Sequence, residues 1–248
     1  MQSIYAEAGI ITRGIIAAML IERLRRLTPI QWFIVLLLAF VALSAVYNLF
    51  LQPGVLIARL LILAIAFPVH EFAHAWAAVA LGDETPRLQG RLTLNPLKHL
   101  EIFGTILLLF NGFGWAKPVQ VYPWSLRGAY GIVWVALAGP ISNLILAFMG
   151  ALGFRLGALQ QNSSILSSIT AEFIYINLIL FFFNLIPLSP LDGEKVAYHL
   201  SPPAWQRYWD RIRPYSIYIL LFIAIFVPAV FSFLVGRPAL FLFNLLAF

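Results

Sequence analysis

The sequence predicts an all-α polytopic membrane protein with five to six transmembrane helices. A short re-entrant or β-hairpin element is expected between the second and third full spans. Of the 248 residues, 62% are hydrophobic and only 10% are charged, whereas a soluble domain carries about 25% charged residues. Several apolar stretches also reach the roughly 20 residues that a helix needs to cross a bilayer. The chain has no cysteine, which excludes disulfide scaffolds, cysteine zinc sites and cysteine catalysis.

Five stretches are long and apolar enough to span a membrane. They are Ile30–Phe50, Val55–Leu81, Gly128–Leu152, Ile165–Ile186 and Tyr215–Val235. A sixth stretch, residues 102–113, is apolar but too short for a full crossing and contains two glycines. We therefore expect it to be a broken or re-entrant segment.

The basic residues are distributed unevenly around these spans. Thirteen of the sixteen Lys and Arg residues precede the first span, lie between the second and third, or lie between the fourth and fifth. Loops rich in Lys and Arg stay in the cytoplasm, so the N-terminus and both longer loops are predicted to be cytoplasmic. The net charge of +6 is thus interpreted as a sign of orientation, and no nucleic-acid partner is expected.

The chain is predicted to have three regions. Residues 1–29 form a cytoplasmic or interfacial segment with an interfacial helix over residues 8–27. Residues 30–236 form one transmembrane domain, whose core covers about residues 55–200, and residues 237–248 form an interfacial tail. Residues 205–213, where aromatic and basic side chains alternate, are predicted to be another interfacial anchor.

The second predicted span contains the motif His70-Glu71-Phe72-Ala73-His74. In a helix, residues four apart lie on one face, one turn apart. The two imidazoles can therefore bind one Zn²⁺, and Glu71 can reach a water molecule on the metal as general base. The alternative is a pair of hydrogen-bonded histidines along a polar seam. Because ionisable residues inside a membrane are costly and usually functional, the metal site is favoured.

A catalytic zinc site needs a third protein ligand. Both remaining histidines, His99 and His199, sit in or beside loops, so a carboxylate is the other option. The acids in or near spans are Glu101, Glu172, Asp192 and Glu194. Asp192 follows two helix-breaking prolines where the fourth span ends. The residue pattern alone leaves open whether Asp192 binds the metal or caps the following helix.

Two motifs resemble the signatures of the site-2 protease family of intramembrane zinc metallopeptidases. They are HEFAH and FNLIPLSPLDG, in the expected order, and AGPISN resembles a third family element. The resemblance covers about residues 67–196 and is to compact prokaryotic members without a PDZ domain. It implies a protein of the prokaryotic cell membrane.

The resemblance also assigns residue roles. His70, His74 and Asp192 would be the ligands of one Zn²⁺, Glu71 the general base, and Asn184 a stabiliser of the oxyanion or the substrate. The alternative for Asn184 is an interhelical hydrogen bond. On the AGPISN span, Gly139 is expected to permit close approach of the backbone and Asn143 to support packing or the orientation of a ligand.

These observations predict an intramembrane zinc endopeptidase that cuts a membrane-spanning protein substrate near its cytoplasmic end. The alternatives are a membrane metal transporter, or a scaffold without catalysis, that uses the same His/His/Asp site. Residues 90–94 are expected to form a short β-hairpin, and residues 114–122 an extended segment. Such strands can pair with an unwound peptide. The candidate substrate-binding residues are Gly90, Leu92, Leu94, Val119 and Val121. The oligomeric state cannot be inferred from the sequence.

Two further charges, Arg59 and Glu172, lie 11 and 12 residues before His70 and Asn184. Both therefore sit roughly 16–18 Å from the catalytic layer, at matched depth. We expect them to pair across the second and fourth spans. The alternative is that each extends separately to the outer interface.

Overall fold

The computed structural model describes residues 53–111, 114–157 and 164–247, together with a few isolated residues before residue 53. The predicted interfacial helix over residues 8–27 and the predicted first span, Ile30–Phe50, thus lie outside the continuously described residues. One local feature is visible there. Thr28 and Gln31 exchange hydrogen bonds between the side chain of each and the N–H of the other, at 2.9 and 3.3 Å. This capping box marks a helix start just before the predicted first span.

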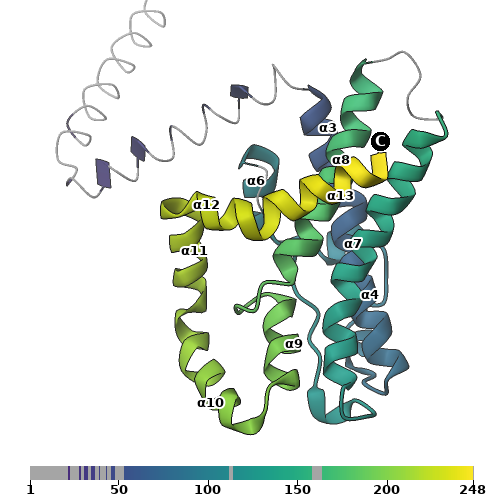
Figure 1. Ribbon diagram of the computed structural model, residues 1–248, viewed down its shortest axis with the longest axis vertical. Coiled ribbons are helices and arrows are strands. Elements are labelled where there is room, and N and C mark those ends of the chain that lie inside the picture. The colour runs from purple at the N-terminus through teal and green to yellow at the C-terminus, as the bar shows by residue number, and fades with distance from the viewer. Residues whose placement is uncertain are drawn as a thin grey trace, which may run out of the picture. The chain divides into compact units, whose positions relative to one another are not determined.

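The chain divides into two compact units, residues 1–47 and 48–248, and the second is described here (Figure 1). It is helical: the described residues contain no strand, only one antiparallel bridge between Leu100 and Ala116. Its long helices are α3 (Pro53–Leu61), α4 (Phe67–Ala80), α6 (Ile102–Asn111), α7 (Gly131–Arg155), α8 (Ser164–Asn184), α9 (Asp192–Leu200), α10 (Pro203–Ile212), α11 (Ser216–Phe226) and α13 (Arg237–Ala247). The short helices α5 (Thr85–Leu88) and α12 (Pro228–Phe231) complete the set of α-helices described.

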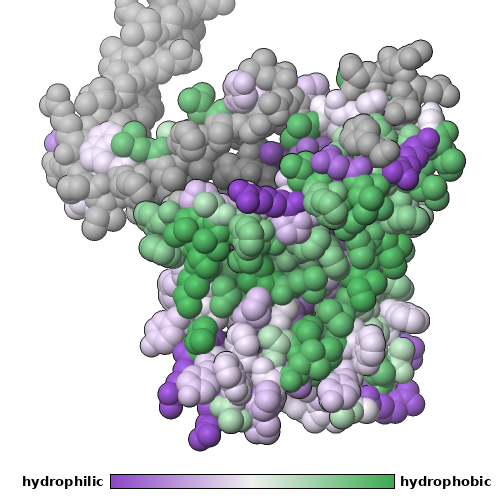
Figure 2. Space-filling model, in the orientation of Figure 1, coloured by the Kyte–Doolittle hydropathy of each residue, from purple (hydrophilic) through white to green (hydrophobic). Residues whose placement is uncertain are grey.

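Four helical stretches in this part of the chain are long and apolar enough to cross a membrane. They are Pro53–Ala80, Gly131–Arg155, Ile165–Asn184 and Pro228–Ala247. The first three correspond to the predicted second, third and fourth spans. Figure 2 shows a broad hydrophobic band between more polar ends on the visible face. This distribution is typical of a membrane protein.

The predicted fifth span, Tyr215–Val235, is not a single helix. Helix α11 ends at Phe226, Val227 adopts φ −131° and ψ 56°, and a new helical stretch begins at Pro228 and continues to Ala247. Proline disfavours a helical conformation in the residue before it, so the helix breaks there. The stretch runs across the direction of α7 and α11 (Figure 1). Residues 237–248, predicted to be a separate interfacial tail, are its continuation up to Ala247.

Two turns of π-helix also have a proline as their cause. Residues 62–66 form one just before Pro68, and residues 232–236 form another just before Pro238. Proline has no N–H for the carbonyl four residues earlier, and the wider turn accommodates that missing bond. In each case the N–H before the proline, of Phe67 or Arg237, bonds five residues back. The first π turn leads directly into the helix that carries His70.

The β-hairpin predicted at residues 90–94 does not form. Gly90 has φ +65° and instead ends helix α5. The N–H of Gly90 bonds to the carbonyl of Arg87, and the N–H of Arg91 bonds to the carbonyl of Pro86, which is a Schellman motif. The following residues form a loop that ends in a 3-10 turn at Pro96–Lys98, capped by the side chain of Asn95. The glycine therefore closes a helix rather than a hairpin.

The chain on either side of the short apolar segment lies close together. The bridge between Leu100 and Ala116 places both of its ends side by side. A Cβ atom on Gly104 or Gly114 would clash with the main chain of Trp115 or of Gly104, respectively, so these glycines permit the close return. That the segment re-enters a membrane stays a prediction.

A guanidinium group meets the C-terminal end of α6. Nη1 of Arg59 donates to the carbonyl of Leu109 at 2.9 Å. The last carbonyls of a helix have no partner within the helix, and Arg59 supplies one for α6. The direct pairing of Arg59 with Glu172 stays a prediction.

The core lies where α7 packs against its neighbours. One apolar cluster joins α7, α8 and α13, and a second joins the π turn before α4 with α6 and α8. Smaller clusters join α4 to α7 and α8 to α11. Helix α7 thus fixes the distance between α4 and α8.

The extended segment 114–122 is held to the helical body by two carboxylates. The N–H of Val119 donates to Oε2 of Glu71 at 3.0 Å, and the N–H of Tyr122 donates to Oδ2 of Asp83 at 2.7 Å. Oδ1 of Asp83 accepts from the N–H of Thr85 at 3.0 Å. Burial of the Asp83 carboxyl raises its pKa, but the hydrogen bonds from Thr85 and Tyr122 outweigh it, so the pKa lies below its ordinary value.

We predict that Asp83→Asn destabilises the protein by about 1–2 kcal/mol at neutral pH, since an amide can accept only one of the two hydrogen bonds. The lowered pKa means that the ionised carboxylate stabilises the folded form above roughly pH 4 and that this contribution is lost as the pH falls through the folded pKa. The difference from wild type in thermal unfolding in detergent should therefore shrink below about pH 4. Glu84→Gln, which alters an exposed pair with Arg87, serves as control. A difference that does not change with pH would contradict this account.

Candidate metal centre and active site

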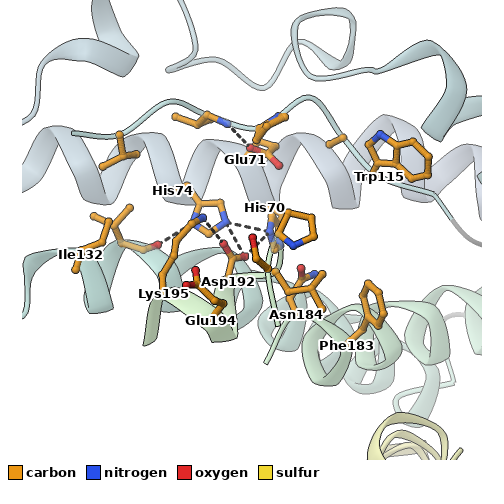
Figure 3. Close-up of a pocket in the computed structure, with 18 of the residues that line it drawn as sticks. His70, Glu71, His74, Trp115, Ile132, Phe183, Asn184, Asp192, Glu194 and Lys195 are labelled. Carbon is orange, nitrogen blue, oxygen red and sulfur yellow. Dashed lines mark hydrogen bonds and ion pairs between the residues drawn. The ribbon is translucent and has the colours of Figure 1, made fainter. Parts of the chain in front are cut away.

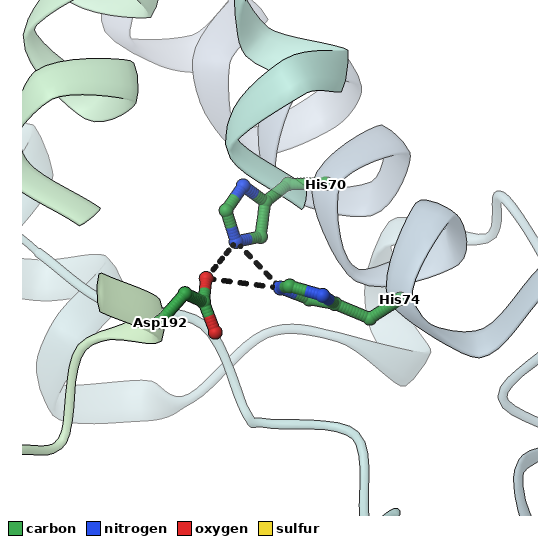
Figure 4. Close-up of side chains that lie close together, drawn as sticks. All are labelled: His70, His74 and Asp192. Atoms are coloured by element: carbon green, nitrogen blue, oxygen red, sulfur yellow. Dashed lines mark hydrogen bonds and ion pairs between the residues drawn. The ribbon is translucent and has the colours of Figure 1, made fainter. Parts of the chain in front are cut away.

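Helix α4 brings the HEFAH histidines together. His70 and His74 lie one turn apart, their ring centroids are 4.6 Å apart and the rings are nearly perpendicular. The two Nε2 atoms are 3.0 Å apart (Figure 4). His74 is buried and His70 is partly buried. The two histidines thus lie on one face of α4, as their four-residue spacing predicts.

Asp192 reaches the histidine pair from the start of α9. Its Oδ2 lies 3.1 Å from Nε2 of His74 and 3.3 Å from Nε2 of His70. A Cβ on the next residue, Gly193, would clash with the carbonyls of Leu185 and Ile186, so this glycine lets α9 begin against the end of α8. Asp192 is the first residue of α9, and the side chain at the cap position before it makes no capping bond. The carboxylate of Asp192 faces the imidazoles instead of capping the helix.

The remaining ring nitrogens of both histidines contact oxygen atoms. Nδ1 of His74 is 2.7 Å from the carbonyl of Val135, and Nδ1 of His70 is 2.6 Å from Oδ1 of Asn143. A carbonyl oxygen only accepts, so Nδ1 of His74 carries a proton, and in the neutral ring Nε2 is then an acceptor. Both amide and carbonyl come from α7.

These three electron-pair donor atoms fit a metal ion. With both Nδ1 atoms protonated, two Nε2 lone pairs and a carboxylate oxygen converge within 3.3 Å of one another. Buried acceptors without a donor are costly, and a divalent cation satisfies all three at once. Two imidazoles and one carboxylate are also a common ligand set of catalytic zinc. Among the described residues, His70, His74 and Asp192 form the group that can hold a metal ion.

The second carboxylate oxygen of Asp192 is held by a cation. Nζ of Lys195 lies 3.0 Å from Oδ1. Since Lys195 is three residues further along α9, the pair forms on one helix face. The ammonium group occupies Oδ1 and leaves Oδ2 to the histidines.

The site opens into a cavity of about 1150 Å³. Figure 3 shows the histidines from α4 next to Asp192, with Asn184 nearby, and Glu71 on the opposite side of the histidines, towards the extended segment. The extended segment 114–122 forms one wall. The cavity is somewhat larger than the roughly 300–1,000 Å³ typical of small-molecule pockets, and it places the carboxylate of Glu71 beside the candidate metal ligands.

The structure gathers most of the predicted site residues. His70, Glu71, His74, Asn143, Asn184 and Asp192 all line the cavity, and so do Val119 and Val121. Gly90, Leu92 and Leu94 do not line it. Nδ2 of Asn184 donates to the carbonyl of Leu180 in its own helix at 3.0 Å.

Gly139 faces the histidine pair directly. A Cβ there would lie 2.6 Å from Nε2 of His70 and still closer to His74. Only glycine lets α7 approach α4 this closely.

Four supporting groups were missed from the sequence. They are the carbonyl of Val135, the N–H of Val119, Lys195 and Asn177, which hydrogen-bonds to Asn143 at 3.0 Å. The main-chain groups leave no signal in a sequence. Asn177 does leave one, because it is a polar residue within an apolar helix, and such residues are usually functional.

A second ion pair ties α9 to the turn between α10 and α11. Nε and Nη2 of Arg213 donate to Oε1 of the buried Glu194 at 3.0 and 2.5 Å. The guanidinium also lies 4.9 Å from the ring centre of Tyr198. Hydrogen bonding to Glu194 raises the pKa of Arg213. The pair holds the helix that carries Asp192 against the chain that follows it.

Apolar helices around a buried His/His/carboxylate cluster with an adjacent glutamate define a membrane metalloprotease. Comparison with curated proteins agrees. The chain is 40% identical over 194 residues to a Bacillus subtilis protein named "Putative zinc metalloprotease YwhC", covering 75% of this chain and 86% of that protein. The Rip2 protein of Mycolicibacterium smegmatis, with the same description, is 31% identical over 143 residues, 54% of each chain.

A Methanocaldococcus jannaschii protein of the same description, MJ0611, is 36% identical over 86 residues, 35% of this chain and 43% of that protein. No family model and no solved structure matches the chain. The chain belongs to the site-2 protease family and is a zinc metalloprotease.

We predict that Gly139→Ala greatly lowers the zinc content of the purified protein. The added methyl group would occupy space next to both Nε2 atoms and push the imidazoles apart. Zinc content is measured by atomic emission on the folded, monodisperse fraction. Gly150→Ala, on the same helix, places a Cβ 3.0 Å from Cγ1 of Ile174 and close to neither histidine, and it serves as the control. Equal zinc content in Gly139→Ala and wild type would remove the cluster from consideration as the zinc site.

Proposed function

We propose that the protein is an intramembrane zinc endopeptidase that hydrolyses a peptide bond in or near a transmembrane segment of its substrate. The observation that carries this proposal is the convergence of His70, His74 and Asp192 beside Glu71, in a cavity enclosed by apolar helices. His70, His74 and Asp192 are the proposed ligands of a single Zn²⁺.

The proposed reaction divides the work between the metal and the chain. Zinc in such a site supplies Lewis acidity, which activates water and polarises the scissile carbonyl. Glu71 accepts the proton of the attacking water and passes it to the leaving amine. The N–H of Val119 holds the carboxylate of Glu71 in place. Asn184, whose amide lines the cavity, is the proposed donor to the developing oxyanion.

The substrate must present an extended peptide to this site. A regular helix keeps its carbonyls inside its own hydrogen bonds, so the substrate has to unwind locally. The extended segment 114–122 lines the cavity and lies in no sheet, which suits it to pair with an unwound peptide. Val119 and Val121 are the proposed contacts.

The proposed orientation follows the basic residues. The loop between α4 and α7 and the chain around α10 carry most of the basic residues in the described part, and both are assigned to the cytoplasm. Trp205 and Tyr208 on α10 are exposed, as expected of an anchor at the membrane interface. The site then lies towards the cytoplasmic side of a multi-pass protein.

A metal transporter is the rival function. A transporter needs further metal ligands along a path through the protein, but the described residues form one such cluster. A transporter would also have no use for the proton-accepting carboxylate of Glu71, which the extended segment holds next to the cluster.

We predict that Glu71→Gln retains zinc but lowers the rate of peptide cleavage at least 10²-fold, since an amide cannot accept the proton. Cleavage of a membrane-spanning test substrate is followed in detergent, and zinc content is measured on the same sample. Asp210→Asn neutralises an exposed carboxylate on α10 and should leave the rate unchanged. Full cleavage by Glu71→Gln would reject this mechanism, and a membrane protein that co-purifies with this variant would identify a substrate.

We also predict that Gln120→Pro slows cleavage of a helical substrate by about 2- to 10-fold more than cleavage of a pre-extended peptide. Proline removes one main-chain N–H from the extended segment, and one hydrogen bond contributes about 0.5–1.5 kcal/mol. The ratio of the two kcat/KM values is compared with that of Gln120→Ala, which keeps the N–H. Equal slowing of both substrates would show that the segment does not hold the unwound peptide.

A further inference from the structure

The hydrogen bond behind His70 continues through two buried amides. Asn143, whose Oδ1 contacts Nδ1 of His70, donates from Nδ2 to Oδ1 of Asn177 at 3.0 Å. Nδ2 of Asn177 donates to the carbonyl of Phe173 at 2.9 Å. Both amide side chains are fully buried. We propose that Asn177 is a positioning residue for the zinc site, because it fixes the orientation of the Asn143 amide and thereby the tautomer of His70. This inference rests on the proposed role of His70 as a ligand.

The direction of this relay is set at its far end. The carbonyl of Phe173 can only accept, so Asn177 must present its NH₂ group to it and its oxygen to Asn143. Asn143 must then present NH₂ to Asn177 and oxygen to His70. Nδ1 of His70 therefore carries the proton, and Nε2 keeps the lone pair that a metal needs. Figure 4 shows the second ring nitrogen of His70 on the side of the ring away from Asp192 and His74.

The relay matters because an amide can rotate. Oxygen and NH₂ of an Asn side chain exchange places on a 180° turn, and the two forms occupy nearly the same volume. With Asn177 removed, Asn143 can turn its NH₂ group towards His70. That orientation favours the tautomer with the proton on Nε2, which cannot bind a metal. His74 needs no such relay, because the main-chain carbonyl of Val135 accepts only.

The location of Asn177 supports this role. It lies on α8, between the apolar Ile176 and Leu178, and has no exposed surface. Packing alone would favour an apolar side chain at this position, since burying an amide is costly unless its hydrogen bonds are made. Both ends of the Asn177 amide are bonded, one to its own helix and one to α7.

The test is the zinc affinity of the full chain in detergent, measured by competition with a chelator on the folded, monodisperse fraction. Asn177→Leu should weaken zinc binding about 10- to 100-fold, the range found for residues that orient metal ligands. Adding Asn143→Asp to this variant should restore the affinity, because a carboxylate accepts with either oxygen and has no wrong orientation. The control is Thr170→Val, which removes a hydrogen bond from Thr170 to the carbonyl of Leu166 on the same helix. It should leave the zinc affinity unchanged.

The outcomes separate the relay from the ligand assignment. Unchanged affinity in Asn177→Leu, or a loss that Asn143→Asp does not restore, overturns the relay, since a purely structural role would not be rescued at a second site. If Asn177→Leu does not fold, Asn177→Ala removes the same amide without added bulk and carries the same expectation. His70→Ala should lower the affinity. If it does not, the ligand assignment itself fails. If it does while Asn177→Leu has no effect, only the relay fails.

Discussion

Three acceptor atoms that converge in an apolar interior are the constraint on which the rest of the structure depends. Two imidazole nitrogens and one carboxylate oxygen lie within 3.3 Å of one another, and without a cation this arrangement would be strongly unfavourable. The surrounding chain makes sense as the means of enforcing it. Gly139 and Gly193 remove side chains that would keep the elements apart. The carbonyl of Val135 and the amide of Asn143 direct both Nε2 lone pairs inward, and Lys195 occupies the remaining carboxylate oxygen. The converging acceptors would therefore destabilise the fold without a metal ion, and a bound metal ion would stabilise it.

The residues that interrupt regular helices determine where the candidate metal ligands lie in the helical body. The π turn before Pro68 absorbs the missing hydrogen bond immediately before the helix that carries the histidines. The proline-rich chain between α8 and α9 turns Asp192 back towards α4. Glycines at 104 and 114 let the short helix α6 return beside its own start, and Arg59 supplies a donor to the end of α6. The interruption before α4 and the one between α8 and α9 thus both adjoin the helices that carry the candidate metal ligands.

The sequence predicts the parts of the molecule that depend on local spacing and not the parts that depend on distant partners. Histidines four residues apart on one helix share a face, and the predicted second, third and fourth spans form helices, so these features were predicted correctly. The hairpin at residues 90–94 was wrong because a glycine with positive φ suits a hairpin turn and a helix end equally, and only the carbonyl of Pro86 decides which forms. The fifth span was wrong because average apolar character outweighed a single residue, Pro228. The relay through Asn177 joins α7 to α8, and no spacing within one helix encodes it.

The proposed general base, Glu71, and the proposed substrate-binding segment are physically linked. The carboxylate of Glu71 accepts the N–H of Val119, and Val119 belongs to the segment that lines the cavity. A peptide that pairs with this segment would therefore take its register from the same backbone that fixes the base. Alignment of the scissile bond and orientation of the carboxylate then come from one element rather than two. Since Asp83 holds the same segment at Tyr122, the position of the proposed base also depends on this carboxylate, which lies just beyond the C-terminal end of α4. This explains in physical terms why a segment without regular secondary structure is held at two points by main-chain hydrogen bonds to carboxylates.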